Sequence, residues 1–315
     1  MGILAIFLFR LDMATVRDIV THISASAWVY AILLIIAQMC LLSLRWQILL
    51  NIGRRHLTFQ DSVKVTLASM LANLLLITSV GGIFVRIALA VQYGASLLKS
   101  FIATAIDRVM TLAALIILSA IFLPMLAPKI DSELFQTIAL CVGLSLILLF
   151  GFMPLFVKYL SQTLPGLTRQ DRRIRYGLRY LQVALRHKKI LAMSIITSLL
   201  AQSAYFIAVY CVAVSTGIDV SFWKMMAVLP VIALIASLPI GVGGWGVREG
   251  AFIFGLGLLG VPLETAFLIS VQIGLIGMLT TVLAGLPMIL TMDISHVKTQ
   301  AVLLTSRLRD AARPK

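Results

Sequence analysis

Long apolar runs recur along this chain, and they constrain its fold more than any other feature. A helix rises ~1.5 Å per residue, so about 20 apolar residues cross the ~30 Å hydrocarbon core of a bilayer. Runs of roughly that length or longer are found at residues 28–50, 100–126, 134–157, 190–216 and 264–292. The chain has 315 residues, of which 61% are hydrophobic and only 12% charged. We therefore predict an all-α fold, a polytopic transmembrane helix bundle forming one domain over residues 1–315.

The excess of positive charge predicts how the bundle is oriented. The chain carries 26 Lys and Arg against 12 Asp and Glu, a net charge of +14. These cations gather between the apolar runs, as in the positive-inside pattern of membrane proteins, so we expect no nucleic-acid partner. Segment 158–189 and the tail 293–315 are both basic, and both are predicted to be cytoplasmic. They follow a first half over 28–157 and a second half over 190–292.

The basic segment 158–189 contains an apolar periodicity. Leucine and isoleucine recur at helical spacing between arginines, at Ile174, Leu178, Leu181 and Leu185. This pattern predicts an amphipathic helix that lies on the anionic inner leaflet. A solvated cationic linker is the alternative.

Two further features are typical of membrane helices. Arg45 and Trp46 near the end of the first long run are expected at the membrane interface, with the arginine snorkelling and the tryptophan in an aromatic belt. The three cysteines lie inside hydrophobic segments without C-x-x-C spacing, at Cys40, Cys141 and Cys211. We expect no disulfide, no metal site and no cofactor.

Glycines interrupt two apolar stretches in the same way. The first interruption contains Gly81 and Gly82, and the second spans Pro239 to Glu249. Both read V-G-G-x-x-V-R; in the second the letters after the valine are Gly243, Gly244, Trp245, Gly246, Val247 and Arg248. Lipid cannot satisfy exposed backbone polar groups, so such breaks survive only inside protein or against water. Because the topology enters them from opposite sides, they predict two interrupted or re-entrant helix pairs in an inverted-topology repeat, with a site near the midplane.

Charged residues accompany both breaks. Exposed N–H groups at a helix N-terminus attract anions, and arginine binds phosphate in a bidentate manner. We therefore expect Arg86 and Arg248 to lie in the first turn after their breaks and to share a ligand with those N–H groups. The alternative is that the glycines permit tight packing while each arginine snorkels or pairs structurally.

Two deep acidic residues are candidates to pair with these arginines. Asp107 and Arg108 lie inside one apolar run and point ~100° apart on a helix, so they are not expected to pair with each other. Asp107 or Glu249 is expected to pair with a site arginine, either as a structural ion pair or as a coupling-ion or proton site.

These residues resemble a known family. Arg45-Trp46, Asn73 ahead of Gly81-Gly82 and Arg86, Asp107-Arg108, and above all the G-G-W-G-V-R-E run ending at Glu249 resemble the lysylphosphatidylglycerol synthetase transmembrane-region, or flippase-like, family. The resemblance runs from about Trp28 to Met292.

The resemblance implies an integral protein of a bacterial or archaeal cell membrane that translocates a lipid or lipid-linked headgroup. It places Asn73, Asp107 and Arg108 at the substrate site beside the residues of the breaks. The soluble aminoacyl-transferase domain of fused family members is not expected here. The family's proline is missing between Leu74 and Val80, and Ile83 stands where a polar residue is frequent, so the second break is expected to carry more of the site.

The leading hypothesis is a lipid flippase or transporter that works by alternating access. Its partner would be an anionic phospholipid or a polyprenyl-phosphate-linked lipid. One alternative is a non-catalytic membrane subunit of a lipid-biosynthetic enzyme, and another is an intramembrane lipid-modifying enzyme. The sequence contains no G-x-S-x-G, no H-E-x-x-H and no acidic pair at useful spacing, so we expect no catalytic residues.

Overall fold

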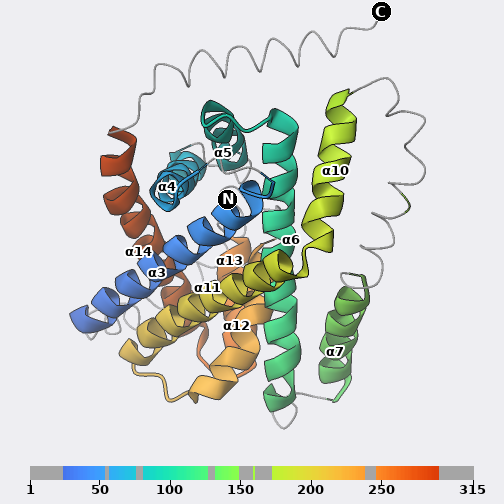
Figure 1. Cartoon of the computed structure of the whole chain (residues 1–315). Coiled ribbons are helices and arrows are strands. Elements are labelled where there is room, and N and C mark those ends of the chain that lie inside the picture. The colour runs from blue at the N-terminus through green and yellow to red at the C-terminus, as the bar shows by residue number, and fades with distance from the viewer. Residues whose placement is uncertain are drawn as a thin grey trace, which may run out of the picture.

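The computed structural model describes residues 24–53, 57–75, 81–126, 132–148, 159, 172–237 and 246–290. Within these ranges every regular element is helical, as the sequence predicts, and no strand occurs (Figure 1). The elements are α3 (Ala25–Leu50), α4 (Phe59–Leu75), α5 (Gly81–Gln92), α6 (Leu97–Phe122), η1 (Leu123–Leu126), α7 (Ser132–Ile147), α10 (Arg172–Arg186), α11 (Lys188–Ser215), α12 (Phe222–Ala236), α13 (Val247–Gly257) and α14 (Leu263–Leu290).

Four of these helices are long and apolar enough to cross a membrane, which confirms helices of that kind at four of the five predicted crossings. They are α3, α6 with its extension η1, α11 and most of α14. The fifth predicted crossing, 134–157, appears as the 16-residue helix α7, and residues 149–157 lie outside the described part of the chain.

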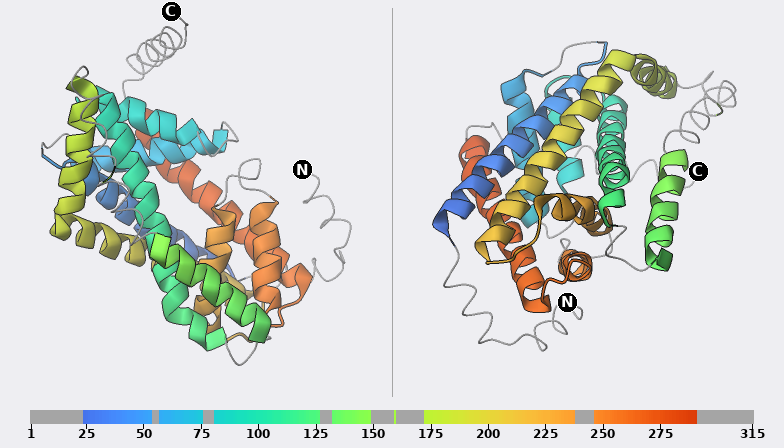
Figure 2. Two further views of the ribbon diagram at one scale, coloured as in Figure 1. Left: turned by 90° about the vertical axis from the view of Figure 1, so that its right-hand side faces the viewer. Right: turned by 90° about the horizontal axis from the view of Figure 1, so that it is seen from below.

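Helices α3 and α11 lie along each other through the middle of the bundle (Figures 1 and 2). Figure 1 shows that the two helices run antiparallel, and Arg45 of α3 donates from Nη1 to Ser198 Oγ of α11 at 2.8 Å. Ala201 and Ala208 of α11 are fully buried, and such small side chains let membrane helices approach closely.

The shorter helices form two antiparallel pairs. At one end of the α4–α5 pair the Gly82 N–H donates to Asn73 Oδ1 at 2.6 Å, and at the other end Tyr93 Oη donates to Asp61 Oδ1 at 3.4 Å. A Cβ on Gly82 would collide with the Ser69 carbonyl and with Asn73, so this close approach requires glycine. The α12–α13 pair lies at the opposite end of the bundle (Figures 1 and 2), with Gly255 packed on Val228 and Ile232.

Helix α10 forms in the basic segment, so the linker alternative is wrong for residues 172–186. The helix also packs on the bundle, because Gly177, Tyr180 and Ala184 are buried on a face adjacent to that of the predicted leucines. Gly177 packs on side chains of α6, and Tyr180 Oη donates to the Leu49 carbonyl at 2.6 Å. Small residues on this face allow close helix contact, whereas the sequence pattern of leucines had suggested the leaflet alone.

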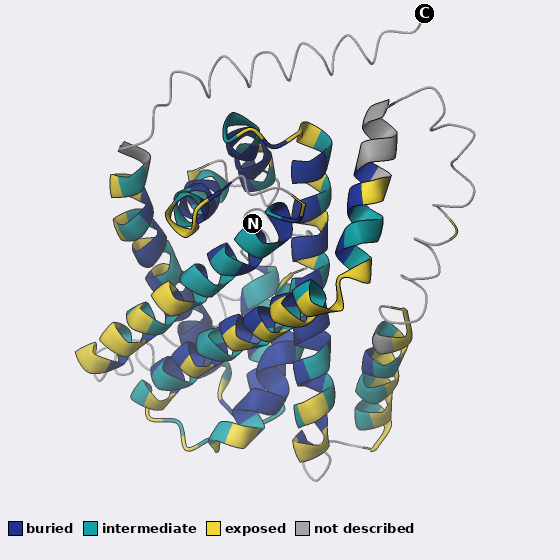
Figure 3. Ribbon diagram, in the orientation of Figure 1, coloured by how far each residue is buried: buried dark blue, intermediate teal, exposed yellow. Residues whose placement is uncertain are grey.

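The bundle is apolar on the outside as well as inside. Figure 3 shows the buried interior and a partly exposed outer surface. That surface includes large apolar side chains such as Leu140 at 66%, Leu283 at 63% and Phe84 at 64% exposure. A water-soluble protein would bury many of these groups, whereas lipid is a suitable solvent for them.

Candidate functional site

Arg248 lies in the first turn of α13, as the sequence predicts for the second break. Gly246 precedes the helix at φ +91°, a backbone conformation that favours glycine, and α13 begins at Val247. The Gly246 N–H donates to Glu249 Oε2 at 2.5 Å, so this acidic residue caps the helix that carries Arg248. Gly243, Gly244 and Trp245 lie outside the described residues.

Glu249 also holds the guanidinium of Arg248. The Arg248 Nε and Nη2 groups donate to Glu249 Oε1 at 3.0 and 2.7 Å, and Ser270 Oγ lies 3.5 Å from the same oxygen. The Glu249 side chain is fully buried, while 21% of the Arg248 side chain is exposed. Both carboxylate oxygens are therefore engaged in fixing the break and its arginine, and the arginine retains an accessible surface.

That accessible surface faces two cavities of about 230 and 320 Å³. Both are lined by Gln38, Tyr205 and Arg248. Arg248 is the one charged residue among the described lining residues of either cavity. Asn73, a predicted site residue from the first half, lines the larger of the two. The structure thus brings Asn73 and Arg248 to one place.

Gly274 of α14 forms the floor under the guanidinium. A Cβ at this position would lie 2.6 Å from Arg248 Nη1 and 2.7 Å from Cζ. Such distances are much shorter than van der Waals contact, so the arginine occupies its position because residue 274 is glycine. Gly277, one turn further along and lining the same cavity, has open space around it.

The first break differs from the expectation. Helix α5 already begins at Gly81, so Gly81 and Gly82 lie inside its first turn and Arg86 lies in the second turn. The prediction that Arg86 lies in the first turn after the break is wrong. In the second motif Gly246 has a positive φ and lies directly before its helix. The corresponding residue of the first motif is Phe84, which lies inside α5, so this helix starts earlier in its motif.

Arg86 is buried in an ion-pair cluster. Its Nη1 lies 3.2 Å from Asp107 Oδ2, its Nε donates to Ser69 Oγ at 3.3 Å, and its guanidinium lies 5.3 Å from the Trp46 ring centroid. The residue is 8% exposed. The first-half arginine therefore has an intramolecular partner and lines neither cavity.

Asp107 binds a second arginine, which the sequence reading missed. Arg45 Nε donates to Asp107 Oδ1 at 2.7 Å. Arg45 is 2% exposed and Trp46 is fully buried, so the expectation that the arginine snorkels and the tryptophan joins a lipid-facing belt is wrong. A buried charge needs a partner, so the carboxylate of Asp107 inside an apolar run was the sequence feature that could have predicted a buried Arg45. The cluster of two arginines and one carboxylate carries a net charge of +1.

Arg108 does not join the site. It is exposed, whereas the neighbouring Asp107 is 3% exposed. Successive residues on a helix point ~100° apart, so burial of one directs the other away. Among the described residues, Arg108 lines neither cavity next to Arg248.

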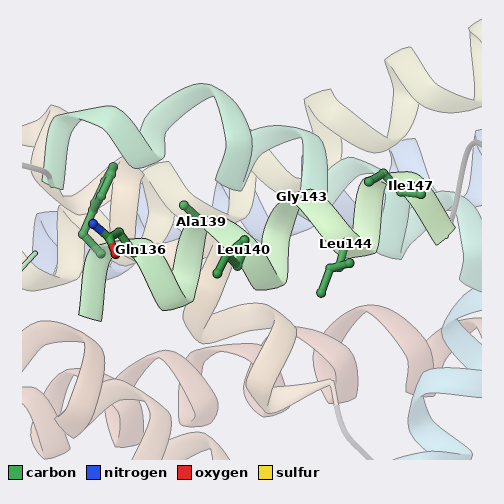
Figure 4. A pocket seen from close by; sticks show the side chains of 7 residues that line it. Gln136, Ala139, Leu140, Gly143, Leu144 and Ile147 are labelled. Atoms are coloured by element: carbon green, nitrogen blue, oxygen red, sulfur yellow. The ribbon is translucent and has the colours of Figure 1, made fainter. Parts of the chain in front are cut away.

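A third cavity, of about 560 Å³, runs along α7 (Figure 4). Its described lining is apolar except for Gln136 and comes from one face of that helix: Phe135, Gln136, Ala139, Leu140, Gly143, Leu144 and Ile147. It is larger than the cavities beside Arg248, yet it offers no charged group. Of these three cavities, the two beside Arg248 are therefore the ones whose described lining can bind a charged group.

The membrane-length helices, the lipid-compatible surface and the buried charges define a multi-pass integral membrane protein. Comparison with family models identifies which kind. The chain belongs to the family described as the lysylphosphatidylglycerol synthase TM region, whose model matches residues 1–285. Comparison with curated proteins and with solved structures finds no match.

Proposed function

We propose that this protein is a lipid flippase that holds an anionic headgroup at Arg248. The observation that carries the proposal is the accessible guanidinium of Arg248 between two cavities inside an apolar bundle. An ionisable side chain deep in a membrane protein is a functional-site hypothesis by default. Arginine is suited to phosphate because its planar fork donates two parallel hydrogen bonds.

The depth of the cavities supports a transport site. Gln38 lies 13 residues into α3, which places it ~20 Å from the start of a helix that spans the bundle. It lines both cavities with Tyr205 of the antiparallel helix α11. A site near the middle of crossing helices is where transporters built from interrupted helices bind their substrates.

A constant sequence offset supports an inverted-topology repeat. Arg86 and Arg248 are 162 residues apart (248 minus 86). The same offset carries α4 from 59–75 to 221–237, and α12 spans 222–236. It carries α3 from 25–50 to 187–212, close to α11 (Lys188–Ser215). It carries α5 from 81–92 to 243–254, close to α13 (Val247–Gly257). It carries α6 from 97–122 to 259–284, close to α14 (Leu263–Leu290).

The packing of the helices is reciprocal in the same sense. Helix α4 of the first half packs on α14 of the second, and its counterpart α12 packs on α6 of the first. Helices α3 and α11, which correspond under the offset, run antiparallel against each other. Two halves of opposite orientation exchange contacts in this way when a pseudo-twofold axis relates them.

The short helices suit re-entrant hairpins. At ~1.5 Å per residue, the 17 residues of α4 and the 15 of α12 extend ~25 and ~22 Å, and α5 and α13 are shorter still. Each is shorter than the ~30 Å hydrocarbon core. We propose that α4–α5 enters from the cytoplasm and α12–α13 from outside, with α10 on the cytoplasmic side of a bacterial or archaeal cell membrane. The two halves would then rock around Arg248.

The residues have distinct roles in this proposal. Arg248 binds the phosphate. Glu249 positions the Arg248 side chain, because the Glu249 carboxylate accepts hydrogen bonds from the Gly246 N–H and from Arg248. Asn73 contributes from the opposite hairpin, while Asp107 fixes Arg86 and Arg45 as a structural cluster. This use of both carboxylates argues against an intramembrane enzyme, which would need one of them as acid or base.

A membrane subunit for a lipid-biosynthetic enzyme is the second candidate. The observation that favours it is a set of exposed cationic residues on α10 and at the start of α11: Arg179, Arg186, Lys188 and Lys189. An enzyme that co-purifies stably with the chain, and is lost when these residues are replaced by glutamine, would support this candidate.

Headgroup translocation in reconstituted vesicles tests the flippase proposal. Arg248→Ala should abolish translocation of fluorescent anionic lipid, and Arg248→Lys should restore it in part, because a point charge replaces a bidentate fork. Arg108→Ala is the matched control, since this arginine lies outside both cavities. Translocation by a folded Arg248→Ala protein at the rate of the parent chain would contradict the proposal.

A further inference from the structure

Three neutral polar side chains beside Arg248 have no hydrogen-bond partner among the described residues. They are the amides of Gln38 and Gln202 and the hydroxyl of Tyr205, all of which line the smaller cavity. Gln202 is only 7% exposed. Buried polar groups in native structures are nearly always hydrogen-bonded, and this applies to Gln202. Gln38 and Tyr205 are half-buried and line the same cavity, so all three groups are available to a molecule that occupies it.

Other polar residues in the same lining are already engaged. Thr111 donates to the Asp107 carbonyl at 3.1 Å, and Ser237 donates to the Leu234 carbonyl at 2.7 Å. In the larger cavity, Thr281 donates to the Gly277 carbonyl at 2.8 Å. Among the described residues, the donors available beside Arg248 in the smaller cavity are therefore the two amides and the phenol, and in the larger cavity the Asn73 amide joins them, since the Gly82 N–H engages only its Oδ1. Each of these groups both donates and accepts, as a ligand hydroxyl does.

The same lining contains no carboxylate. Neither cavity includes an aspartate or glutamate among its described residues, and the nearby Glu249 is fully buried and engaged on both oxygens. A cationic group that entered these cavities would lose its hydration and meet Arg248 without a counter-charge.

We infer that the substrate headgroup is one phosphodiester carrying uncharged hydroxyls, and that the site rejects headgroups with an added amine. This inference rests on the proposed function and deepens it. The phosphate pairs with Arg248, while the hydroxyls exchange hydrogen bonds with Gln38, Gln202 and Tyr205. Rejection of aminoacylated lipids follows from the missing carboxylate, because leaving a buried charge unpaired opposes binding.

A set of lipids that share one phosphodiester tests the inference. Vesicles would hold the full chain and a fluorescent-tailed phosphatidylglycerol, phosphatidylethanol or lysyl-phosphatidylglycerol, whose headgroups end in a diol, an ethyl group and an aminoacylated glycerol. We expect phosphatidylglycerol to move about tenfold faster than either of the others, a factor that corresponds to the loss of one good interaction. A polyprenyl-linked glycosyl phosphate, which also carries a phosphodiester and hydroxyls, forms a fourth arm. Its translocation rate relative to that of phosphatidylglycerol shows whether the protein moves a polyprenyl-linked lipid or a glycerophospholipid.

Isosteric variants link this selectivity to the cavity. Gln202→Leu, and separately Gln38→Leu, should bring the ratio of phosphatidylglycerol to phosphatidylethanol rates towards one. Both replacements keep volume and add no buried polar group, so at least one is expected to fold. Gln38→Glu should narrow the gap between phosphatidylglycerol and its lysyl ester.

The possible failures are distinguishable. Equal rates for the three glycerophospholipids, or faster movement of the lysyl ester, would overturn the substrate class while leaving the flippase proposal intact. No movement of any of the four lipids by a monodisperse, folded protein would overturn the flippase proposal, and the substrate class with it.

Discussion

Gly274 controls where the Arg248 guanidinium lies, because a methyl group at this position would overlap Nη1 and Cζ. The arginine is thus placed by three elements at once: α13 carries it, Glu249 orients it and the α14 backbone supports it. Such placement matters for phosphate binding, since a bidentate pair depends on the direction of both N–H groups.

Gly274→Ala should reduce lipid translocation about tenfold while the protein remains folded. A methyl group there would displace the guanidinium, which is the flexible end of a partly exposed side chain, and a loss of about 1.4 kcal/mol in headgroup binding corresponds to a factor of ten. Translocation rates and thermal unfolding in detergent would be measured together. Gly277→Ala is the control, because a Cβ there meets nothing within 4 Å although Gly277 lines the same cavity. Equal rates for the two variants would show that the guanidinium position is unimportant.

Tyr180 makes a polar contact between helix α10 and the bundle. Tyr180 is 5% exposed, donates to the last turn of α3 at Leu49, and lies with its ring 5.5 Å from Lys99 Nζ of α6. The helix therefore links the basic segment between the halves to the first half of the bundle. Its exposed residues Arg179 and Arg186 remain available to the leaflet or to a partner.

Tyr180→Phe should loosen α10 without unfolding the bundle. Loss of this hydrogen bond costs about 0.5–1.5 kcal/mol, because the Leu49 carbonyl still accepts from the Ile52 N–H. Tryptic cleavage after Arg179 and Arg186 should accelerate, as followed by mass spectrometry. Tyr30→Phe provides the comparison, because Tyr30 is 61% exposed on α3. If the two variants are cut at the same rate, the hydroxyl of Tyr180 does not secure the helix.

The sequence could predict the helices but not all of their partners. Apolar runs fix α3, α6, α11 and α14 because only a helix satisfies its own backbone in lipid. The pairing of Arg45 with Asp107 joins residues 62 positions apart, and no local pattern encodes that contact. Likewise, the leucine spacing predicted helix α10, whereas the face it buries depends on Gly177 fitting against α6.

Only part of the site could be predicted from the sequence, because local motifs mark some of its residues and helix packing brings in the others. Arg248, Glu249 and Asn73 follow from the glycine motif and from the family resemblance, and the structure brings them together. Gln38 and Tyr205 could not be found this way, because they lie on separate helices whose register is set by the packing of α3 on α11.

The whole molecule is proposed to move as two halves. Helix α4 of the first half meets α14 of the second where a Cβ on Gly285 would lie 3.8 Å from the Leu67 Cβ. This separation matches the mean Cβ–Cβ distance of a disulfide, ~3.8 Å. A covalent link at this contact would therefore join the halves with little strain.

Leu67→Cys with Gly285→Cys, in a chain whose Cys40, Cys141 and Cys211 are replaced by alanine, should form a disulfide under mild oxidation. Translocation should stop on oxidation and return on reduction, because rocking requires the α4–α14 contact to change. Each single-cysteine variant serves as control. Undiminished translocation by the fully crosslinked protein would exclude relative motion of the halves at this contact.

The central claim is that Arg248 holds a lipid phosphate, and native mass spectrometry tests it most directly. Purified chain, Arg248→Ala and Arg108→Ala would be released from detergent with the lipids that each retains. The account predicts one tightly held anionic lipid on the parent chain and on Arg108→Ala, and its loss from Arg248→Ala. Retention of the same lipid by Arg248→Ala at the level of the parent chain would contradict the account.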